Sequence, residues 1–382
     1  MKIRVCFPLI ILSFLISCQS DSGKDSIRFY IGTYAEKSDY GILSCQLDIR
    51  ESSIDILSST SGVKNPSFLA MDPKGESLYA VSEVDDFSAD NYGGVFAFRM
   101  DPVDGSLSLI NSIHSGGAHP CHLTIHPSGS NLYVANYSGG NISSIQISSS
   151  GELLTDVQTI QHLGSGPNKA RQDKAHAHSV NLTSGGLFLY ACDLGIDQVV
   201  AYSITPQSKR LKPRESVALS MASGSGPRHM AFSQDERLAF IINELNSTIT
   251  ICSNDPETGK IVPLQSVSTL PEDYKGENYC ADIHVHPNKA IVYASNRGHN
   301  SIAVFKLDSE SGGLNVVQYQ DTKGDWPRNF AIDPEGRVLL VANQRSDNVV
   351  VFRIDKHTGL LEETNVEMAV SKPVCILFFN QV

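Results

Sequence analysis

The sequence predicts an all-β protein folded as a seven-bladed β-propeller with four antiparallel strands per blade. An apolar strand recurs at intervals of roughly fifty residues, and a second alternating strand follows each copy. Several of the second strands lead into a turn of the form D-G-x-L or T-G-x-L. Helical periodicity is absent, so the pattern excludes a helical bundle or an alternating α/β fold.

The recurring apolar strand gives the number of blades. Its copies lie at residues 78–83, 132–137, 189–194, 239–244, 292–297 and 339–344. Their fifth residues share one slot, occupied by Ser82, Asn136, Asp193, Asn243, Asn296 and Asn343, and one further step back reaches Gly32. The second strand begins near residues 41, 94, 141, 198, 247, 301 and 348. Both series have seven members, and a blade cannot bury both faces alone, so we expect a closed ring of seven blades.

The strand that opens each unit predicts how the ring closes. It is seen in PSFLAM from residue 66, PCHLTI from residue 120 and NFAIDP from residue 329. The seventh copy is PVCILFFN at 373–380, close to the C-terminus, whereas the other strands of its blade start at Phe29. We therefore expect the C-terminal strand to pair with the N-terminal strands within one blade.

The first eighteen residues have the pattern of a secretory signal peptide. Lys2 and Arg4 precede an apolar run, and small or polar residues follow it from Ser17. The segment Leu15-Ile16-Ser17-Cys18 resembles a bacterial lipobox, which predicts a lipidated Cys18 at the mature N-terminus. An ordinary cleaved signal and an uncleaved apolar anchor are the alternatives.

The resulting organisation is a signal peptide at 1–18, a flexible tether at 19–26 and a propeller domain at 27–382. It predicts an exported protein, either periplasmic or associated with the outer membrane, that contacts the membrane only through its lipid. The formal net charge of −11 makes nucleic acid an improbable partner. Closed propellers have protected strand edges, so we expect a monomer. Six widely spaced cysteines without a C-x-x-C pair are expected to be buried free thiols.

Polar residues gather where the opening strands begin and the apolar strands end, and these positions meet at one face of a propeller. Aligned starts of the opening strands form a ring of Phe68, His122, His178, His229, Asp282, Asn329 and Cys375. Neighbouring positions add Arg228, Arg328 and His176, and the strand ends add Glu83, Tyr137, Glu244, Arg297 and Gln344. Positions facing a core are normally apolar, so this set indicates a site, although any one histidine is as readily a hydrogen-bonded strut between blades.

The residue types suit hydrolysis of an ester or lactone, which needs a base, a proton donor and positive groups near the developing oxyanion. Glu244 or His178 is the candidate base and His229 the candidate proton donor. Arg228 and Arg297 are candidates to hold a carboxylate or phosphate through paired hydrogen bonds. Histidines with carboxylates also resemble a zinc-ligand set, but these come from successive blades several ångströms apart, so we expect no metal and no cofactor.

At these residues the sequence resembles the seven-bladed propeller lactonases, which include bacterial 6-phosphogluconolactonases and fungal carboxymuconate lactonizing enzymes. The resemblance spans roughly Ile27 to Phe379. Its segments are YIGTY (30), NPSFLA (65), AHPCHL (118), VANYSGGN (134), RQDKAHAHSV (171), DLGIDQV (193), GPRHMAF (226), NEL (243) and SNRGHNSIAVF (295).

The resemblance implies opening of 6-phosphogluconolactone to 6-phosphogluconate. The muconate branch implies a His, Arg, Glu and Arg constellation, whose positions here are His178, Arg228, Glu244 and Arg297. The residues expected to contact substrate are Arg171, His176, His122, Asn136, Asp193, Arg328 and Arg297. The export signal points instead to an unphosphorylated sugar lactone or another oxidised glycoside. A muconate-type cyclase or isomerase, or a propeller that binds a ligand or protein without turnover, are the alternatives.

Overall fold

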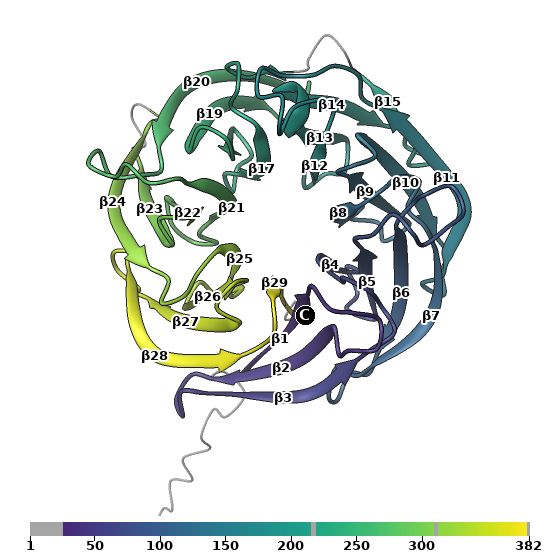
Figure 1. Cartoon of the computed structure of the whole chain (residues 1–382), viewed down its shortest axis with the longest axis horizontal. Helices are drawn as coiled ribbons and strands as arrows, with labels where there is room; N and C mark the ends of the chain where they lie inside the picture. The colour runs from purple at the N-terminus through teal and green to yellow at the C-terminus, as the bar shows by residue number, and fades with distance from the viewer. Residues whose placement is uncertain (1–25, 215–218, 309–311, 380–382) are drawn as a thin grey trace, which may run out of the picture.

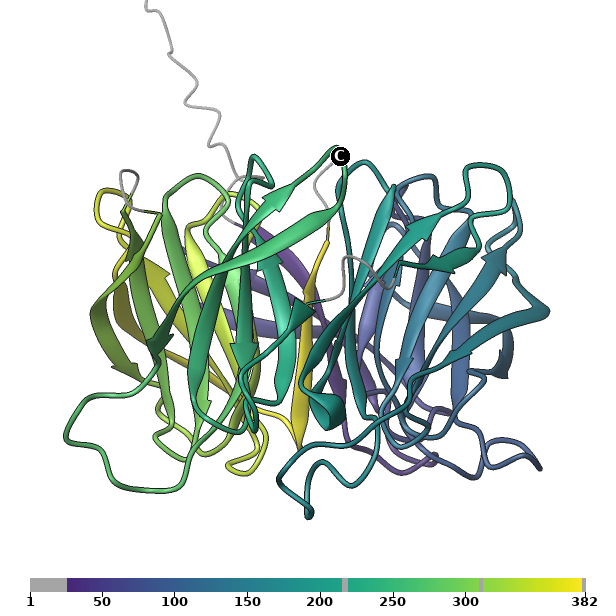
Figure 2. The ribbon, with the colours of Figure 1, turned by 90° about the horizontal axis from the view of Figure 1, so that it is seen from above.

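Seven antiparallel sheets surround a central axis in the computed structural model, which describes residues 26–214, 219–308 and 312–379 (Figure 1). Six sheets follow the chain order of their strands, and the strands run roughly along the axis of a short cylinder (Figure 2). The predicted fold class is confirmed: a seven-bladed propeller with almost no helix.

Each blade uses its strands in the same order from the axis outward. The strands nearest the axis are β4 (Leu69–Met71), β8 (Pro120–Ile125), β12 (Ala177–Leu182), β17 (Pro227–Phe232), β21 (Tyr279–Val285), β25 (Pro327–Ile332) and β29 (Pro373–Phe378). The second strands are β1 (Ser26–Thr33), β5 (Ser77–Ser82), β9 (Asn131–Asn136), β13 (Phe188–Asp193), β18 (Leu238–Asn243), β22 (Ile291–Arg297) and β26 (Val338–Asn343).

The outer half of each blade completes the sheets. The third strands are β2 (Ile42–Asp48), β6 (Gly94–Met100), β10 (Asn141–Ile147), β14 (Gln198–Ile204), β19 (Thr248–Asp255), β23 (Ser301–Leu307) and β27 (Asn348–Ile354). The outermost are β3 (Ser53–Thr60), β7 (Leu107–His114), β11 (Leu153–Gln161), β15 (Leu211–Pro213), β16 (Leu219–Ser220), β20 (Lys260–Ser268), β24 (Leu314–Asp321) and β28 (Leu361–Ala369). A single turn of 3₁₀-helix, η1 (Leu194–Ile196), follows β13.

Burial explains why the layers differ in sequence. Every residue of β5, β9, β13 and β26 is buried, because both faces of these strands pack against neighbouring blades. The outermost strands alternate between buried and exposed positions or face solvent, as the largely exposed β20 does. The largely apolar second strands are therefore the clearest repeat in the sequence.

The ring closes as predicted. The C-terminal strand β29 pairs antiparallel with β1, and the sheet order is β29-β1-β2-β3 (Figure 1). Phe29 pairs with Phe378, with ring centroids 5.8 Å apart, and Ile31 pairs with Ile376. These residues share one core cluster with β26 and β27 of the adjacent blade, so the closing strand joins two blades.

Loss of the buried ring at the closure is expected to weaken the whole propeller. Phe378→Ala should lower the free energy of unfolding by about 3–5 kcal/mol, because it removes apolar contacts and leaves a cavity between two blades. Urea denaturation followed by fluorescence measures this loss. Leu163→Ala, at a side chain that is 84% exposed, is the control and should change stability little; equal losses for both would contradict the closure argument.

The cysteine prediction is also confirmed for the described residues. Cys45, Cys121, Cys192, Cys252, Cys280 and Cys375 are buried free thiols, and each lies in a strand. Burial raises the pKa of Cys192 and Cys375 to about 12. Cys18 and the predicted signal peptide lie outside the described residues. No helix in the described part of the chain is long and apolar enough to cross a membrane.

Candidate active site at one mouth of the propeller

Three histidines from three consecutive blades meet where the innermost strands begin. His122, His178 and His229 lie at the starts of β8, β12 and β17, and all three are buried. The ring centroid of His229 is 5.3 Å from that of His122 and 5.4 Å from that of His178. Phe68 covers His122 at 4.1 Å. The structure thus brings the three predicted histidines together. Their register differs from the predicted alignment at His178, because the next residue, Ser179, pairs with Cys192 as His122 pairs with Ala135.

Glu244 is the centre of an arginine cluster beside these histidines. Its Oε2 lies 2.8 Å from Nη2 of Arg297 and 3.1 Å from Nε of Arg228, and its Oε1 pairs with Nη2 of Arg171. The side chains of Glu244, Arg228 and Arg297 are 5% exposed or less, whereas that of Arg171 is 34% exposed. Burial raises the pKa of Glu244, but the three arginines outweigh it and lower the pKa to about 2. Glu244 is therefore a charged anchor of the arginines and a very weak base.

The two buried arginines are both fastened to strand β21. Nη1 of Arg228 donates to the carbonyl oxygen of Ala281. Nε of Arg297 donates to Tyr279 O at 3.2 Å, and its Nη2 donates to Cys280 O at 3.0 Å. Burial lowers the pKa of both guanidinium groups. A desolvated charge in fixed geometry is well suited to stabilise a developing anion.

His229 is held in a defined tautomer. Its Nδ1 lies 2.8 Å from Oδ1 of Asp282, and its Nε2 lies 3.2 Å from Nη1 of Arg228. Because Arg228 can only donate, Nε2 must accept and Nδ1 must carry the proton. Burial and the charge of Arg228 lower the pKa of His229 to about 4. A neutral imidazole with both nitrogens occupied does not favour the proton-donor role that the sequence predicts for His229.

His178 has a free ring nitrogen. Its Nδ1 lies 3.8 Å from Sγ of Cys121, and Nε2 makes no hydrogen bond to any residue that the structure describes. Burial, together with Arg228 and His229, holds the pKa of His178 well below 6.5. His122 is likewise contacted through Nδ1, which accepts a hydrogen bond from the amide of Val180 at 3.4 Å. His178 is therefore a neutral base that can contact water or substrate through Nε2.

The remaining rim residues surround this centre. Arg171 contacts the hydroxyl of Tyr137 at 3.5 Å, and the ring of His176 stacks on Tyr137 with centroids 4.5 Å apart. On another side, the guanidinium of Arg328 lies 5.4 Å from the ring centroid of Tyr34. The Tyr34 hydroxyl donates to Oε2 of Glu83 at 2.9 Å. Arg171, His176 and Arg328 thus lie at the rim, as predicted.

Two close backbone approaches fix the loop that carries Arg171, His176 and His178. Gly140 has a φ of 64°, and a Cβ there would come within 2.5 Å of the carbonyl oxygen of Ala175. A Cβ on Gly195 would come within 1.9 Å of the carbonyl oxygen of Lys174. Both glycines are thus required where neighbouring segments pack against this loop.

Two predicted substrate-binding residues do not join the cluster. Asn136 and Asp193 have no exposed surface. Nδ2 of Asn136 contacts Ser143 Oγ at 3.2 Å and Ser115 O at 3.5 Å. Asp193 binds Nδ1 of His162 at 2.6 Å and the amide of His176 at 2.7 Å. The side chains in this slot hold the connecting segments in place through hydrogen bonds. Because side chains alternate along a strand, the following residue points toward the mouth. We leave both out of the proposed site.

The same alternation reveals a residue that the sequence reasoning misses. His122 pairs with Ala135, and its equivalent Cys375 pairs with Gly32. Gly32 therefore corresponds to Ala135, so the repeat slot falls on Thr33 and not on Gly32 as predicted. Tyr34 then occupies the position of Tyr137 and Glu244. The copy of the repeat at residues 29–34 is aligned one residue too early, so the sequence reasoning does not identify Tyr34 as a rim residue.

The fold and the site define a propeller with a buried cationic centre and neutral imidazoles at one mouth. Residues 28–378 match the family described as Lactonase, 7-bladed beta-propeller, and the chain belongs to this family of hydrolases that act on lactone esters. It is 33% identical to the 6-phosphogluconolactonase of Bacillus subtilis over 353 residues, covering 92% of this chain and 98% of that protein.

Two further relatives cover nearly the same range. A 6-phosphogluconolactonase of Formosa agariphila is 33% identical over 356 residues, with 92% of this chain and 99% of that protein covered. The solved structure of the periplasmic gluconolactonase of Pseudomonas aeruginosa superposes with a TM-score of 0.86 at 31% identity, covering 93% of this chain and 99% of that one. The predicted resemblance to propeller lactonases is confirmed.

Proposed function

We propose that the chain opens the lactone of a sugar acid at the mouth defined by His178, Glu244, Arg228 and Arg297. The observation that carries this proposal is the arginine cluster, because it concentrates positive charge on a chain whose formal net charge is −11. Attack of water on the lactone carbonyl places negative charge on its oxygen, and the product is a carboxylate. Buried guanidinium groups stabilise both anions more strongly than water does.

In the proposed mechanism His178 is the base. Nε2 removes a proton from the attacking water, which bonds to the lactone carbonyl carbon while Arg228 and Arg297 hold the oxyanion. The carbon–oxygen bond of the ring then breaks, and the proton passes from His178 to the departing ring oxygen, which becomes a hydroxyl. Glu244 keeps the arginines in place throughout, because its low pKa makes it a poor proton acceptor.

We propose an unphosphorylated sugar lactone as the natural substrate. The predicted export signal supports this, since phosphorylated sugars are cytoplasmic, and so does the likeness to a periplasmic gluconolactonase. Three arginines around Glu244 are already engaged with a carboxylate. Arg171 is the most exposed of the three, so a substrate phosphate would interact most strongly with this residue.

Comparing the hydrolysis of glucono-1,5-lactone with that of 6-phosphogluconolactone tests whether the substrate is phosphorylated. We expect kcat/KM for glucono-1,5-lactone to equal or exceed that for the phosphorylated compound, measured with the purified protein and corrected for spontaneous opening. Arg171→Gln should affect both substrates to the same degree. A strong preference for 6-phosphogluconolactone that Arg171→Gln abolishes would reverse the assignment, and acceleration of neither would overturn sugar-lactone hydrolysis.

We further propose that Cys18 carries a lipid that holds a monomeric propeller at the membrane surface. Cys18→Ser should move the protein from the membrane fraction to the soluble periplasmic fraction and abolish incorporation of labelled fatty acid. Lactone hydrolysis by the purified variant should be unchanged, because residue 18 precedes the propeller. Unaltered membrane association of the variant would contradict the lipid anchor.

A further inference from the structure

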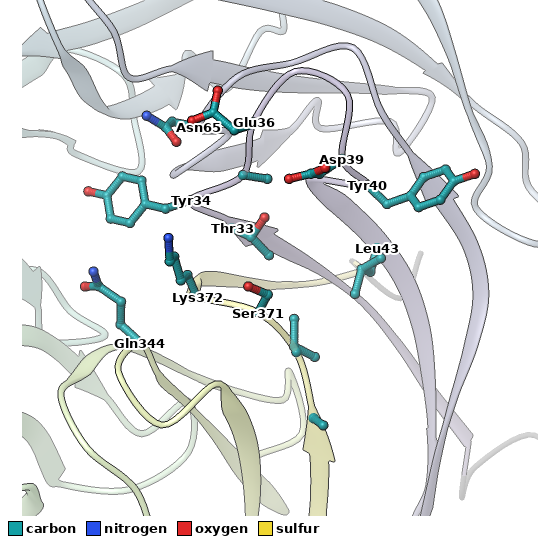
Figure 3. Close-up of a pocket in the computed structure, with 13 residues that line it drawn as sticks. Thr33, Tyr34, Glu36, Asp39, Tyr40, Leu43, Asn65, Gln344, Ser371 and Lys372 are labelled. Carbon is teal, nitrogen blue, oxygen red and sulfur yellow. The ribbon is translucent and has the colours of Figure 1, made fainter.

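A cavity opens next to the rim residue Tyr34, where the N-terminal and C-terminal strands meet. It has a volume of about 630 Å³ and lies between the β1–β2 loop and the β28–β29 connection. Its polar lining includes Tyr34, Glu36, Asp39, Asn65, Gln344, Ser371 and Lys372. Figure 3 shows the Tyr34 ring, the Gln344 amide and the Lys372 ammonium group turned toward the same space. A cavity of this volume is within the range that holds a small molecule.

The cavity and the rim of the mouth share Tyr34. Tyr34 lines the cavity, while its ring lies under the Arg328 guanidinium and its hydroxyl binds Glu83. Asn65, also in the lining, donates from Nδ2 to the carbonyl oxygen of Glu83 at 3.3 Å. Arg328 and Arg228 follow the prolines that begin β25 and β17, at equivalent register positions, so both lie at the same mouth. A ligand at the mouth that extends past Tyr34 would therefore enter the cavity.

The chemistry of the cavity differs from that of the arginine cluster. Two carboxylates, Glu36 and Asp39, and one ammonium group, Lys372, line the cavity, so the lining does not suit a phosphate or carboxylate. Lys372 Nζ makes no ion pair or hydrogen bond to the part of the chain that the structure describes. Hydroxyl, amide, carboxylate and ammonium groups offer donors and acceptors together, and the Tyr34 ring adds an apolar edge. This mixture matches a neutral, polyhydroxylated group.

We infer that the cavity is a subsite for a neutral sugar unit joined to the lactone, and that the substrate class is a glycosyl aldonolactone. The inference rests on the proposed function and deepens it. The lactone ring lies at the arginines, water adds to its carbonyl carbon, and its ring carbon–oxygen bond breaks to give a carboxylate and a hydroxyl. The glycosidic bond stays intact, with its sugar in the cavity.

Cellobiono-1,5-lactone, in which a glucosyl group is attached to gluconolactone, tests the subsite. We expect its kcat/KM to exceed that of glucono-1,5-lactone by about tenfold or more, because a site built for hydroxyl groups loses affinity when they are missing. Ser371 is exposed, and Ser371→Trp should place an indole ring in the cavity. The kcat/KM for cellobiono-1,5-lactone should then fall to that for glucono-1,5-lactone. Hydrolysis of glucono-1,5-lactone should be unchanged.

The control is Ser184→Trp, at an exposed serine in the β12–β13 turn on the opposite face, which should leave both rates unaltered. Titration calorimetry with cellobionate and gluconate gives a readout independent of turnover. Ser371→Trp should weaken the binding of cellobionate and leave the binding of gluconate unchanged. Equal kcat/KM for the two lactones, or no effect of Ser371→Trp on cellobiono-1,5-lactone, overturns the subsite alone. Hydrolysis of neither lactone overturns the proposed function, and the subsite falls with it.

Discussion

His178→Asn is expected to lower kcat for lactone hydrolysis by about a hundredfold or more, the usual contribution of a positioned base. The reason is geometric, since Nε2 of His178 has no hydrogen-bond partner among the described residues and lies on the ring of side chains at the mouth. The arginines that hold the carbonyl are untouched, so KM should change little. Steady-state kinetics on glucono-1,5-lactone separate the two constants.

His122→Asn is the matched control. His122 lies on the opening strand one blade earlier, is also buried and is also neutral. Its ring packs against the rings of Phe68 and His229, so we expect a packing role and less than a tenfold loss in kcat. A larger loss in His122→Asn than in His178→Asn would assign the base to His122.

The pH dependence follows from the same assignment. Burial keeps the pKa of His178 well below 6.5, so its neutral, basic form is present throughout the neutral range. The rate of the catalysed reaction should therefore stay constant as the pH falls from 8 to 6.5 after correction for spontaneous opening. Glu244, with a pKa of about 2, predicts no change in this range either.

The fold is largely predictable from the sequence because each blade repeats the same burial pattern. The second strands are buried on both faces, so they are largely apolar and can be counted. Ring closure follows from the count, since one opening strand is missing from the first blade and present at 373–378. In the copy at residues 29–34, which resembles the others least, the predicted slot is one residue too early.

The site is only partly predictable, because composition identifies polar residues but not the groups they contact. The cluster of His178, Arg228, Glu244 and Arg297 is expected from the sequence and is brought together by the fold. The tethering role of Asn136 and Asp193 depends on strand alternation, which directs adjacent residues to opposite faces. The state of Glu244 depends on three arginines from distant segments, and the sequence alone cannot give their distances.

Glu244→Gln is expected to have a large effect on stability as well as a strong effect on activity. Removing the carboxylate leaves Arg228 and Arg297 buried without their counter-charge, which typically costs about 3–5 kcal/mol of unfolding free energy. The two guanidinium groups also lose the contacts at 3.1 and 2.8 Å that orient them toward the carbonyl. We therefore expect kcat/KM to fall by about a hundredfold or more.

The pH dependence distinguishes a lost charge from lost packing. The folded pKa of Glu244 is about 2, below the value of roughly 4.3 for an unfolded glutamate. Its ionisation therefore stabilises the native state fully above the unfolded pKa, and this contribution disappears as the pH falls toward 2. Urea denaturation should show a difference between wild type and Glu244→Gln that is constant near neutral pH and shrinks between roughly pH 5 and pH 2.

Glu83→Gln provides the matched control for the second prediction. Glu83 follows β5 in the register position that Glu244 takes after β18, but its Oε2 accepts from the hydroxyls of Tyr34 and Ser67 instead of pairing with buried arginines. A neutral amide oxygen can still accept those hydrogen bonds, so Glu83→Gln should lose about 1 kcal/mol or less. Adding Arg171→Gln to Glu244→Gln should recover part of the lost stability by removing one repelling charge. If the double variant is less stable than Glu244→Gln, then Glu244 does not serve as the common counter-charge of these arginines.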